Sequence, residues 1–371
     1  MDDAGAGAPA PTDRRFTNEQ MWRASELMLE TGVLCDRLGF DSFWLTEHHF
    51  QYEGYEVVPN GLLFGSVLAE RTEQIRIGTM FNIVGQWHPL RLAEDFATLH
   101  NLSGGRGILG VGRGTVPREA RALGTDIGSF DNPDQVAADE LNRKQFDEAM
   151  DVIQLALTQE EFSFHGDVFD FPPAGIPDRG GFVEKLTLVP RPLTDFETWQ
   201  AITSPPTLDY VPRKGWGGVF WLKHYSFVKQ FWDRFQEIYE ESHATTLAPG
   251  AKRTLVVTPW IADSKEEGIA QVRNGHDEFW KFLGPYGWSR GYMGPDGKPS
   301  PAGLIPTLEE SIENKTWLVG TPDDIIEGIK FYEDLLGGLD NLVIFPNMPG
   351  DKYSTTADQL NRFAAEVLPH L

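Results

Sequence analysis

The sequence predicts an α/β fold, a (β/α)8 barrel in which parallel strands alternate with helices. Short runs of β-forming residues alternate with helical periods from residue 16 almost to the end of the chain. Alternation of this kind implies parallel strands joined by right-handed crossovers. The length of 371 residues suits one large barrel, and the 40% of apolar residues can form its core. We therefore expect residues 1–15 to form a flexible tail and residues 16–371 a single barrel domain.

The first element expected is a helix that begins after Thr17. Thr17 and Gln20 have the spacing of a capping box, in which each side chain satisfies the other residue's backbone N–H group. Apolar residues recur at helical spacing as far as Leu38, and Gly39 can end the helix in the left-handed conformation.

Seven strands are expected after this helix, with helices between them. The helix that starts at Thr321 has a hydroxyl cap, a proline in its first turn and two acidic residues where the helix dipole favours them. Seven strands are one short of a closed barrel, and the missing strand would precede the first helix. Either the barrel begins unusually or the gene start is misplaced. The expected strands are 42–46, 75–80, 108–112, 198–203, 218–221, 255–261 and 342–345.

Two segments interrupt the alternation. Residues 114–141 are expected to form a long loop. Residues 284–303 hold six Gly and four Pro among twenty positions, together with three aromatic residues. That composition predicts a mobile loop or lid, with an ordered surface excursion as the alternative.

The charge balance and the cysteine content exclude several classes of protein. There are 55 acidic and 32 basic side chains, a net charge of −23, which argues against partners such as nucleic acid or an anionic membrane. Any anionic ligand must be held locally, by an Arg or a helix N-terminus. Cys35 is the only cysteine, so a disulfide framework and a multi-thiolate metal site are excluded. With neither a signal peptide nor an apolar run of about 20 residues, we expect a cytoplasmic protein.

Active sites of parallel barrels lie at the carboxyl ends of the strands, and one such end carries two histidines. Glu47, His48 and His49 follow the first expected strand directly. Adjacent residues of an extended segment point to opposite sides, so this pair is a poor metal site. A single imidazole aimed into the barrel mouth suits proton transfer near neutral pH. The alternative is that both histidines are bonded only to local backbone.

Two further strand ends carry glycines. Residues 78–82 combine a glycine with apolar side chains, a surface for a flat ring or simply part of the core. Residues 110–114 look like a dinucleotide fingerprint, but Thr115 stands where its third glycine would be. These glycines are expected to let the backbone approach a ligand closely, while Arg113 supplies one fixed positive charge.

A fourth strand end carries hydroxyl groups. Thr203, Ser204 and Thr207 lie between an expected strand and helix. The hydroxyls of Ser204 and Thr207 flank a helix N-terminus, whose N–H groups and dipole attract an anion such as a phosphate. Plain N-capping is the alternative.

Taken together, these stretches resemble the bacterial luciferase-like family of flavin-dependent monooxygenases. The resemblance covers nearly the whole chain from residue 16. It is carried, in this order, by residues 39–50, 76–79, 88–95, 103–106, 110–114, 199–204 and 319–322. The resemblance implies an eight-fold barrel of the luciferase-like type, with reduced FMN bound at its C-terminal mouth.

The resemblance also implies roles for individual residues. His48 is similar to the family's active-site histidine, and Glu47 matches a residue beside the flavin ring. Met80 and Phe81 match the pair that supports the ring, joined in the family by a non-prolyl cis peptide bond, which we expect here. The phosphate contacts are matched by Arg113, Thr203, Ser204 and Thr207, and no metal ligand is implied.

The implied activity is that of a two-component monooxygenase. Reduced FMN, delivered by a separate flavin reductase, would react with oxygen to give a peroxyflavin, which oxygenates a small lipophilic substrate. His48 would donate or accept the proton. Luciferase-like proteins usually pair through helices beside the barrel, so a homodimer is expected. Aromatic residues near the strand ends suit an apolar pocket, or else belong to the core: Trp216, Trp221, Tyr225, Trp260, Phe279 and Trp288.

Three alternatives remain open at this point. The nearest is a deazaflavin-dependent oxidoreductase of the same superfamily, which transfers hydride without oxygen. The acidic balance disfavours it, because deazaflavin has a long acidic tail that needs basic contacts. The second is a flavin-binding protein without turnover. The third is a metal-dependent barrel hydrolase, which would contain a bound metal.

Overall fold

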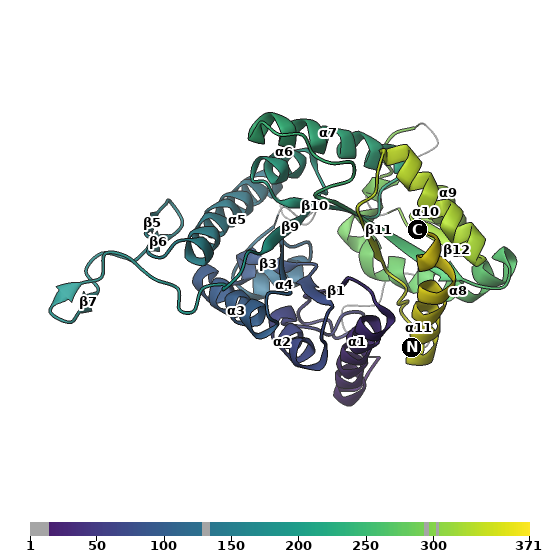
Figure 1. Cartoon of the computed structure of the whole chain (residues 1–371), viewed down its shortest axis with the longest axis horizontal. Coiled ribbons are helices and arrows are strands. Elements are labelled where there is room, and N and C mark those ends of the chain that lie inside the picture. The colour runs from purple at the N-terminus through teal and green to yellow at the C-terminus, as the bar shows by residue number, and fades with distance from the viewer. Residues whose placement is uncertain (1–14, 128–133, 293–296, 302–303) are drawn as a thin grey trace. The chain divides into compact units, whose positions relative to one another are not determined.

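A computed structural model describes residues 15–127, 134–292, 297–301 and 304–371 (Figure 1). By its contacts the chain forms two compact units. The first unit comprises Met1–Phe40, Tyr52–Tyr55 and Trp199–Leu371, and the second comprises Asp41–Gln51 and Glu56–Thr198. Of the predicted tail, residues 1–14 lie outside the described residues.

The second unit contains a parallel sheet with the strand order β1-β2-β4. In its register Leu45 lies opposite Thr79, and Gly78 lies opposite Ile108. The short strand β3 also runs parallel to β4. The strands are β1 (Ser42–Leu45), β2 (Arg76–Thr79), β3 (Asn82–Ile83) and β4 (Gly107–Gly112), and the helices are α2 (Gly61–Arg71), η1 (Val84–Gln86), α3 (Pro89–Leu102), α4 (Pro117–Ala122) and α5 (Gln135–Thr158).

Burial in this unit follows from the parallel arrangement. Every residue of β4 is buried, as expected for a parallel strand covered on both faces. Helix α3 buries one apolar side, including Leu92, Phe96 and Leu99. The unit also contains two small antiparallel hairpins, which the sequence did not predict: β5 (Phe164–His165) with β6 (Asp170–Phe171), and β7 (Pro177–Asp178) with β8 (Gly181–Phe182).

The first unit repeats the alternation of strands and helices around β11. This nine-residue strand pairs through its first half with β13 and through its second half with β12, in parallel on both sides. The strand β10 joins β9 to β11. The strands are β9 (Glu197–Ala201), β10 (Gly217–Phe220), β11 (Arg253–Ile261), β12 (Trp317–Gly320) and β13 (Asn341–Ile344).

The helices of the first unit lie between these strands and at both ends of the chain. They are α1 (Asn18–Leu38), α6 (Pro205–Arg213), α7 (Tyr225–His243), α8 (Lys265–Leu283), η2 (Gly284–Tyr286), η3 (Trp288–Gly291), α9 (Leu308–Glu313), α10 (Pro322–Leu336), α11 (Tyr353–Arg362), η4 (Phe363–Val367) and η5 (Leu368–His370).

The local signals read from the sequence are confirmed. Thr17 and Gln20 form the capping box of α1, and Gly39 ends that helix with a φ of 81°. Thr321 forms a capping box with Asp324, and Pro322 stands in the first turn of α10. All seven expected strands are present, with ends that differ by at most two residues.

Two features differ from the expectation. The parallel strand β12 was missed, because a run of only four residues leading directly into a helix has no β periodicity of its own. The segment 114–141 is not all loop, since it contains α4 and the first turns of α5; residues 128–133 within it lie outside the described residues. From residue 15 onward, no strand precedes α1.

Among the described helices, none is both long and apolar enough to cross a bilayer.

Candidate functional site

The residues that follow β1 form a group of buried polar side chains. The Glu47 side chain is fully buried, and both its oxygens accept from the indole Nε1 of Trp87, at 3.0 and 3.1 Å. The Nε2 of His49 lies 3.1 Å from Glu47 Oε1. In the described structure the Glu47 carboxylate therefore anchors the indole of Trp87 and the ring of His49.

His48 contacts a different carboxylate from its neighbour His49, as expected because adjacent residues of an extended segment point to opposite sides. Its Nδ1 lies 3.1 Å from Oε1 of Glu119, on α4. A carboxylate can only accept, so Nδ1 donates the proton of this bond. The same Glu119 oxygen accepts from Gln51 Nε2 at 2.6 Å, and Arg118 donates to Gln51 Oε1 at 3.0 Å. The His48 side chain is 20% exposed and that of Glu119 only 3%.

The charges around His48 favour its protonated form. Burial acts to lower the pKa of His48, but the hydrogen bond to Glu119 and the charges of Glu56, Glu119 and Glu47 outweigh it, so the pKa is raised above its usual value. Burial raises the pKa of Glu56, against the opposing effects of His48 and of the Thr46 hydroxyl, which donates to Glu56 at 2.8 Å. The cluster therefore retains protons to a higher pH than free side chains would.

The end of β2 carries the predicted pair. The peptide bond between Met80 and Phe81 is cis, as expected from the family resemblance. The Met80 N–H donates to the carbonyl of Leu45, at the end of β1, over 2.6 Å. Asn82 Nδ2 donates to the carbonyl of Gly110 on β4 at 2.9 Å. These bonds connect the ends of β1, β2 and β4 through the backbone around the pair.

The glycines of β4 make room for the chain itself. A Cβ on Gly110 would lie 1.6 Å from the carbonyl oxygen of Thr79, and one on Gly112 would lie 3.1 Å from the Cβ of Phe81. We expected these glycines to admit a ligand. In the described structure they admit the neighbouring strand end.

Arg113 follows β4 and is held by α5. Its Nη1 lies 2.9 Å from Asp139 and 3.2 Å from Asn142 Oδ1. The Arg113 side chain is 19% exposed. An anion at this position would share the guanidinium with Asp139.

The predicted hydroxyl group lies in the first unit, at the end of β9. Ser204 is the N-cap of α6, yet its side chain caps no backbone N–H. Its Oγ lies 3.1 Å from Oγ1 of Thr207, which is buried. Since Pro205 and Pro206 lack N–H groups, Thr207 supplies the first N–H of this helix. The polar donors here are therefore two hydroxyls and one N–H, fewer than a helix start usually presents.

A lysine that the sequence reading did not single out lies beside this group. Lys223 follows β10, and its Nζ donates to the carbonyl of Thr203 at 3.3 Å. Burial lowers the pKa of Lys223 to about 8. Its position two residues beyond an expected strand end was the only signal available in the sequence.

Half-buried aromatic rings lie at the ends of β10 and β13 in the first unit. Trp221 packs against Phe279, Trp288 and Phe345 with ring centroids 5.6–6.0 Å apart. The indole Nε1 of Trp221 is buried and has no hydrogen-bond partner among the described residues. Of the other aromatic residues singled out from the sequence, Trp216, Trp260 and Phe279 are core residues.

Part of the predicted lid packs against the same core. Tyr292 is 1% exposed, and its hydroxyl bonds to Ser311 at 3.2 Å and Thr316 at 2.7 Å. Residues 284–292 form short helical turns at the end of α8. For these residues the ordered alternative describes the structure, while residues 293–296 and 302–303 lie outside the described residues.

The predicted site residues thus fall into two groups. The second unit holds Glu47, His48, Met80, Phe81 and Arg113 at the ends of β1, β2 and β4, and the first unit holds Thr203, Ser204 and Thr207. Sequence reasoning missed Glu119, because the contact joins residues 71 positions apart. Within the described ranges, no group of three or more His, Cys, Asp or Glu could hold a metal ion.

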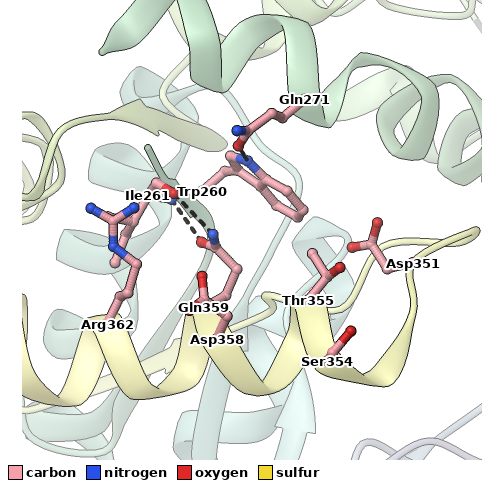
Figure 2. A pocket seen from close by; sticks show the side chains of 9 residues that line it. All are labelled: Trp260, Ile261, Gln271, Asp351, Ser354, Thr355, Asp358, Gln359 and Arg362. Atoms are coloured by element: carbon pink, nitrogen blue, oxygen red, sulfur yellow. Dashed lines mark hydrogen bonds between the residues drawn. The ribbon is translucent and has the colours of Figure 1, made fainter. Parts of the chain in front are cut away.

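A further cavity lies elsewhere in the first unit. Figure 2 shows a polar cavity of about 530 Å³ bordered by the end of β11, α8 and α11. In it Gln359 bonds both the N–H and the carbonyl of Ile261, and Gln271 accepts from the Trp260 indole. Burial raises the pKa of Asp351, on its rim, to about 6. None of the predicted site residues lines this cavity.

Comparison with known proteins places the chain in a family. The model described as luciferase-like monooxygenase matches residues 15–338. The chain is 27% identical over 341 residues to 4-hydroxyprotoasukamycin monooxygenase of Streptomyces nodosus subsp. asukaensis, covering 87% of this chain and 80% of that protein. It is 25% identical over 357 residues to an F420-dependent glucose-6-phosphate dehydrogenase of Amycolatopsis mediterranei, covering 93% and 94%.

The fold is shared with solved structures. The oxygenating constituent of 3,6-diketocamphane monooxygenase of Pseudomonas putida, in complex with FMN, matches with a TM-score of 0.73 and 20% identity, over 100% of this chain and 99% of that one. Likeness at this identity shows the fold alone. The predicted barrel fold of the luciferase-like type is thereby confirmed.

Proposed function

The chain belongs to the luciferase-like monooxygenase family, and we propose that it is an FMN-dependent monooxygenase acting on a small lipophilic substrate. The observation that carries this proposal is the state of His48. Its ring is partly exposed, its Nδ1 is fixed by Glu119, and its pKa is raised by surrounding carboxylates. An imidazole held in this way is suited to exchange a proton with a bound ligand near neutral pH.

The residues present fit a flavin mononucleotide. Ser204 and Thr207 keep their hydroxyls off the helix N–H groups and bond to each other, so both can turn to a phosphate. Within the second unit, taken by itself, Arg113 offers a guanidinium, and Met80 and Phe81 lie at a strand end where a ring could rest. When bound, reduced FMN supplies the activation of oxygen, from which one atom is transferred to the substrate.

The protein's own residues would orient the bound ligands, shield them from water and transfer protons. Glu47 holds Trp87 and His49 in place, and Glu119 holds His48 through its Nδ1. With its raised pKa, His48 can donate a proton at neutral pH and take it back later in the cycle. The pKa of Glu56 is also raised, and its charge interacts with that of His48.

The proposed substrate class follows from the aromatic group around Trp221. Three half-buried rings, Trp221, Trp288 and Phe345, pack around the buried Phe279 of α8. They present apolar surface, and the indole N–H of Trp221 has no partner among the described residues. A small lipophilic molecule carrying a single hydrogen-bond acceptor, such as a ketone, suits this combination.

Two partners are part of the proposal. A separate flavin reductase would supply reduced FMN, because the proposed reaction consumes a reduced flavin in every turnover. A second copy would pair through helices beside the sheet. Helix α2 exposes Leu63 and Val67, which lie four residues apart on one face, by 64% and 38%.

A deazaflavin-dependent dehydrogenase is the second candidate function. The observation that favours it is the 25% identity to the F420-dependent enzyme over 93% of this chain, since F420 is a deazaflavin coenzyme. The net charge of −23 weighs against it, because the acidic tail of deazaflavin needs basic contacts.

Isotope labelling tests the proposal and separates it from both rivals. The protein would be supplied with a flavin reductase, FMN and lipophilic ketones and alkenes under oxygen-18 gas. A parallel arm would contain oxidised deazaflavin and lipophilic alcohols, which can give up a hydride. One labelled oxygen atom in the product is expected. Substrate oxidation without label, supported only by oxidised deazaflavin, would establish the dehydrogenase instead. Tight FMN binding with no product from any substrate would indicate a flavin-binding protein without turnover.

A further inference from the structure

Lys223 lies in an unusual backbone setting at the end of β10. The residue before it, Leu222, is 2% exposed and has a φ of 52°, in the left-handed region. Gly291 packs directly on this turn: a Cβ there would lie 2.1 Å from the Leu222 carbonyl oxygen. For a branched residue such a conformation is rare, and it tends to occur where a side chain must be aimed for a function.

The neighbours that the described part of the chain gives the Lys223 ammonium are uncharged. Its Nζ donates to the Thr203 carbonyl and lies 5.2 Å from the centre of the Phe231 ring. Burial is the single cause that lowers its pKa, so no carboxylate acts on it among the described residues. The next residue is His224, whose pKa is lowered by burial despite the opposing charge of Glu313. Its Nδ1 accepts from the Ser226 N–H.

This isolation is notable because acidic side chains exceed basic ones by 55 to 32. A half-buried cation without a counter-charge raises the free energy of the folded state. The chain has many carboxylates, yet none of those described pairs with this cation. A bound ligand that carries the negative charge would account for this.

We propose that Lys223 supplies the positive charge that binds a phosphate monoester beside Thr203, next to the hydroxyls of Ser204 and Thr207. The inference rests on the proposed function insofar as FMN is the first source of that phosphate. A phosphorylated substrate would be the second source, with the same chemistry.

A phosphate monoester fits these donors better than a carboxylate. The Lys223 ammonium, the Ser204 and Thr207 hydroxyls and the Thr207 N–H are donors of three chemical kinds. A phosphate has three terminal oxygens to share among them and up to two negative charges, whereas a carboxylate has two oxygens and one charge. Lysine binds phosphate as a point charge and needs no planar, two-pronged partner.

The test compares FMN with riboflavin, which lacks the phosphate. Dissociation constants for both, oxidised and reduced, would be measured at pH 7 for the wild type, Lys223→Met and Lys223→Arg. In Lys223→Met we expect FMN affinity to fall by roughly tenfold to a hundredfold and riboflavin affinity to stay unchanged. Lys223→Arg should keep most of the preference for FMN. Lys214→Met, which changes an exposed lysine at the other end of α6, is the matched control.

A pH series supplies an independent readout. Because the pKa of Lys223 is about 8, the wild-type preference for FMN over riboflavin should decline between pH 8 and 9.5. The preference should be flat over this range in Lys223→Arg, which stays charged. The pH series uses only the wild type and Lys223→Arg, so it tests the role of Lys223 even if Lys223→Met does not fold.

The outcomes are distinguishable. Equal FMN affinity in the wild type and Lys223→Met overturns the inference while leaving the proposed function standing. If no flavin binds the wild type, the proposed function fails, and inorganic phosphate becomes the probe. Thermal stabilisation by phosphate that disappears in Lys223→Met would then support a phosphate from another ligand, and its absence in both proteins would contradict the inference.

Discussion

At the scale of single residues, the account depends on how carboxylates set the state of His48. Three acidic residues act on it: Glu119 directly, and Glu56 and Glu47 through their charge. The stability that its raised pKa contributes is fully present below the usual value of 6.5 and is lost as the pH rises through the raised value. His48 should therefore remain protonated at a pH where a free imidazole is neutral.

Replacing Glu119 with Gln should lower the pKa of His48, because both the charged hydrogen bond and the carboxylate charge disappear. NMR titration of the imidazole would measure this, and the acid-dependent limb of the activity profile should move to lower pH with it. Asp126→Asn, which breaks an exposed contact with Arg121 in the same unit, is the control. An unchanged pKa in Glu119→Gln would show that this carboxylate does not set the state of His48.

Replacing His48 with Ala should leave FMN binding nearly intact and lower coupled product formation. A reduction of about 10²- to 10⁴-fold is typical for the loss of a general acid–base group. Product per oxygen consumed and the FMN dissociation constant would be measured together. His165→Ala, an exposed histidine on a hairpin, should change neither. Full activity in His48→Ala would remove the imidazole from the mechanism.

At the scale of elements, the loop after β1 is fixed by contacts made within the first unit. Tyr55 donates to Glu278 on α8 at 3.2 Å, and its ring stacks on Phe282 with centroids 5.2 Å apart. Lys281 and Arg15 also bond Glu278, at 2.6 and 3.4 Å. This cluster therefore fixes the segment Tyr52–Tyr55 within the first unit.

The substitution Glu278→Gln should be strongly destabilising, because it removes the negative charge that faces the buried Lys281 ammonium. The two side chains are 4% and 7% exposed, and breaking such a pair costs about 3–5 kcal/mol. Chemical denaturation would measure the free energy of unfolding. Asp233→Asn removes an exposed pair with Lys229 and should cost about 0.5 kcal/mol or less. Equal effects would contradict a buried anchor at Glu278.

The substitution Gly110→Ala should destabilise the junction of β2 and β4. The added methyl group would lie 1.6 Å from the Thr79 carbonyl oxygen, so the strands must separate, at a cost of about 1–3 kcal/mol or more. The control is Gly181→Ala, where the nearest atom lies 3.8 Å away. A wild-type unfolding midpoint in Gly110→Ala would show that this close approach is absent.

The elements that the sequence predicts well are those with local signals. Thr17 and Thr321 cap helices through partners three residues away, and the alternation of strands and helices follows from short-range periodicity. The partner of His48 could not be predicted, because Glu119 lies in a stretch read as loop and is brought close only by the pairing of distant strands. The cis bond at Met80 was available only through the family resemblance.

At the scale of the whole molecule, the net charge of −23 limits which anions can bind. Long-range attraction is unfavourable for any phosphate ligand, so affinity must come from a few local groups. FMN carries one phosphate and needs few such groups, whereas the deazaflavin coenzyme carries a longer acidic tail. Both the charge and the isolated Lys223 therefore favour the smaller cofactor.

The most direct test of the central claim is an anaerobic titration of the purified protein with reduced FMN, run beside an identical titration with reduced deazaflavin. We predict saturable binding of reduced FMN, altered kinetics of flavin reoxidation when oxygen is admitted, and no comparable binding of deazaflavin. Saturable binding of deazaflavin alone, or of neither cofactor, would contradict the account.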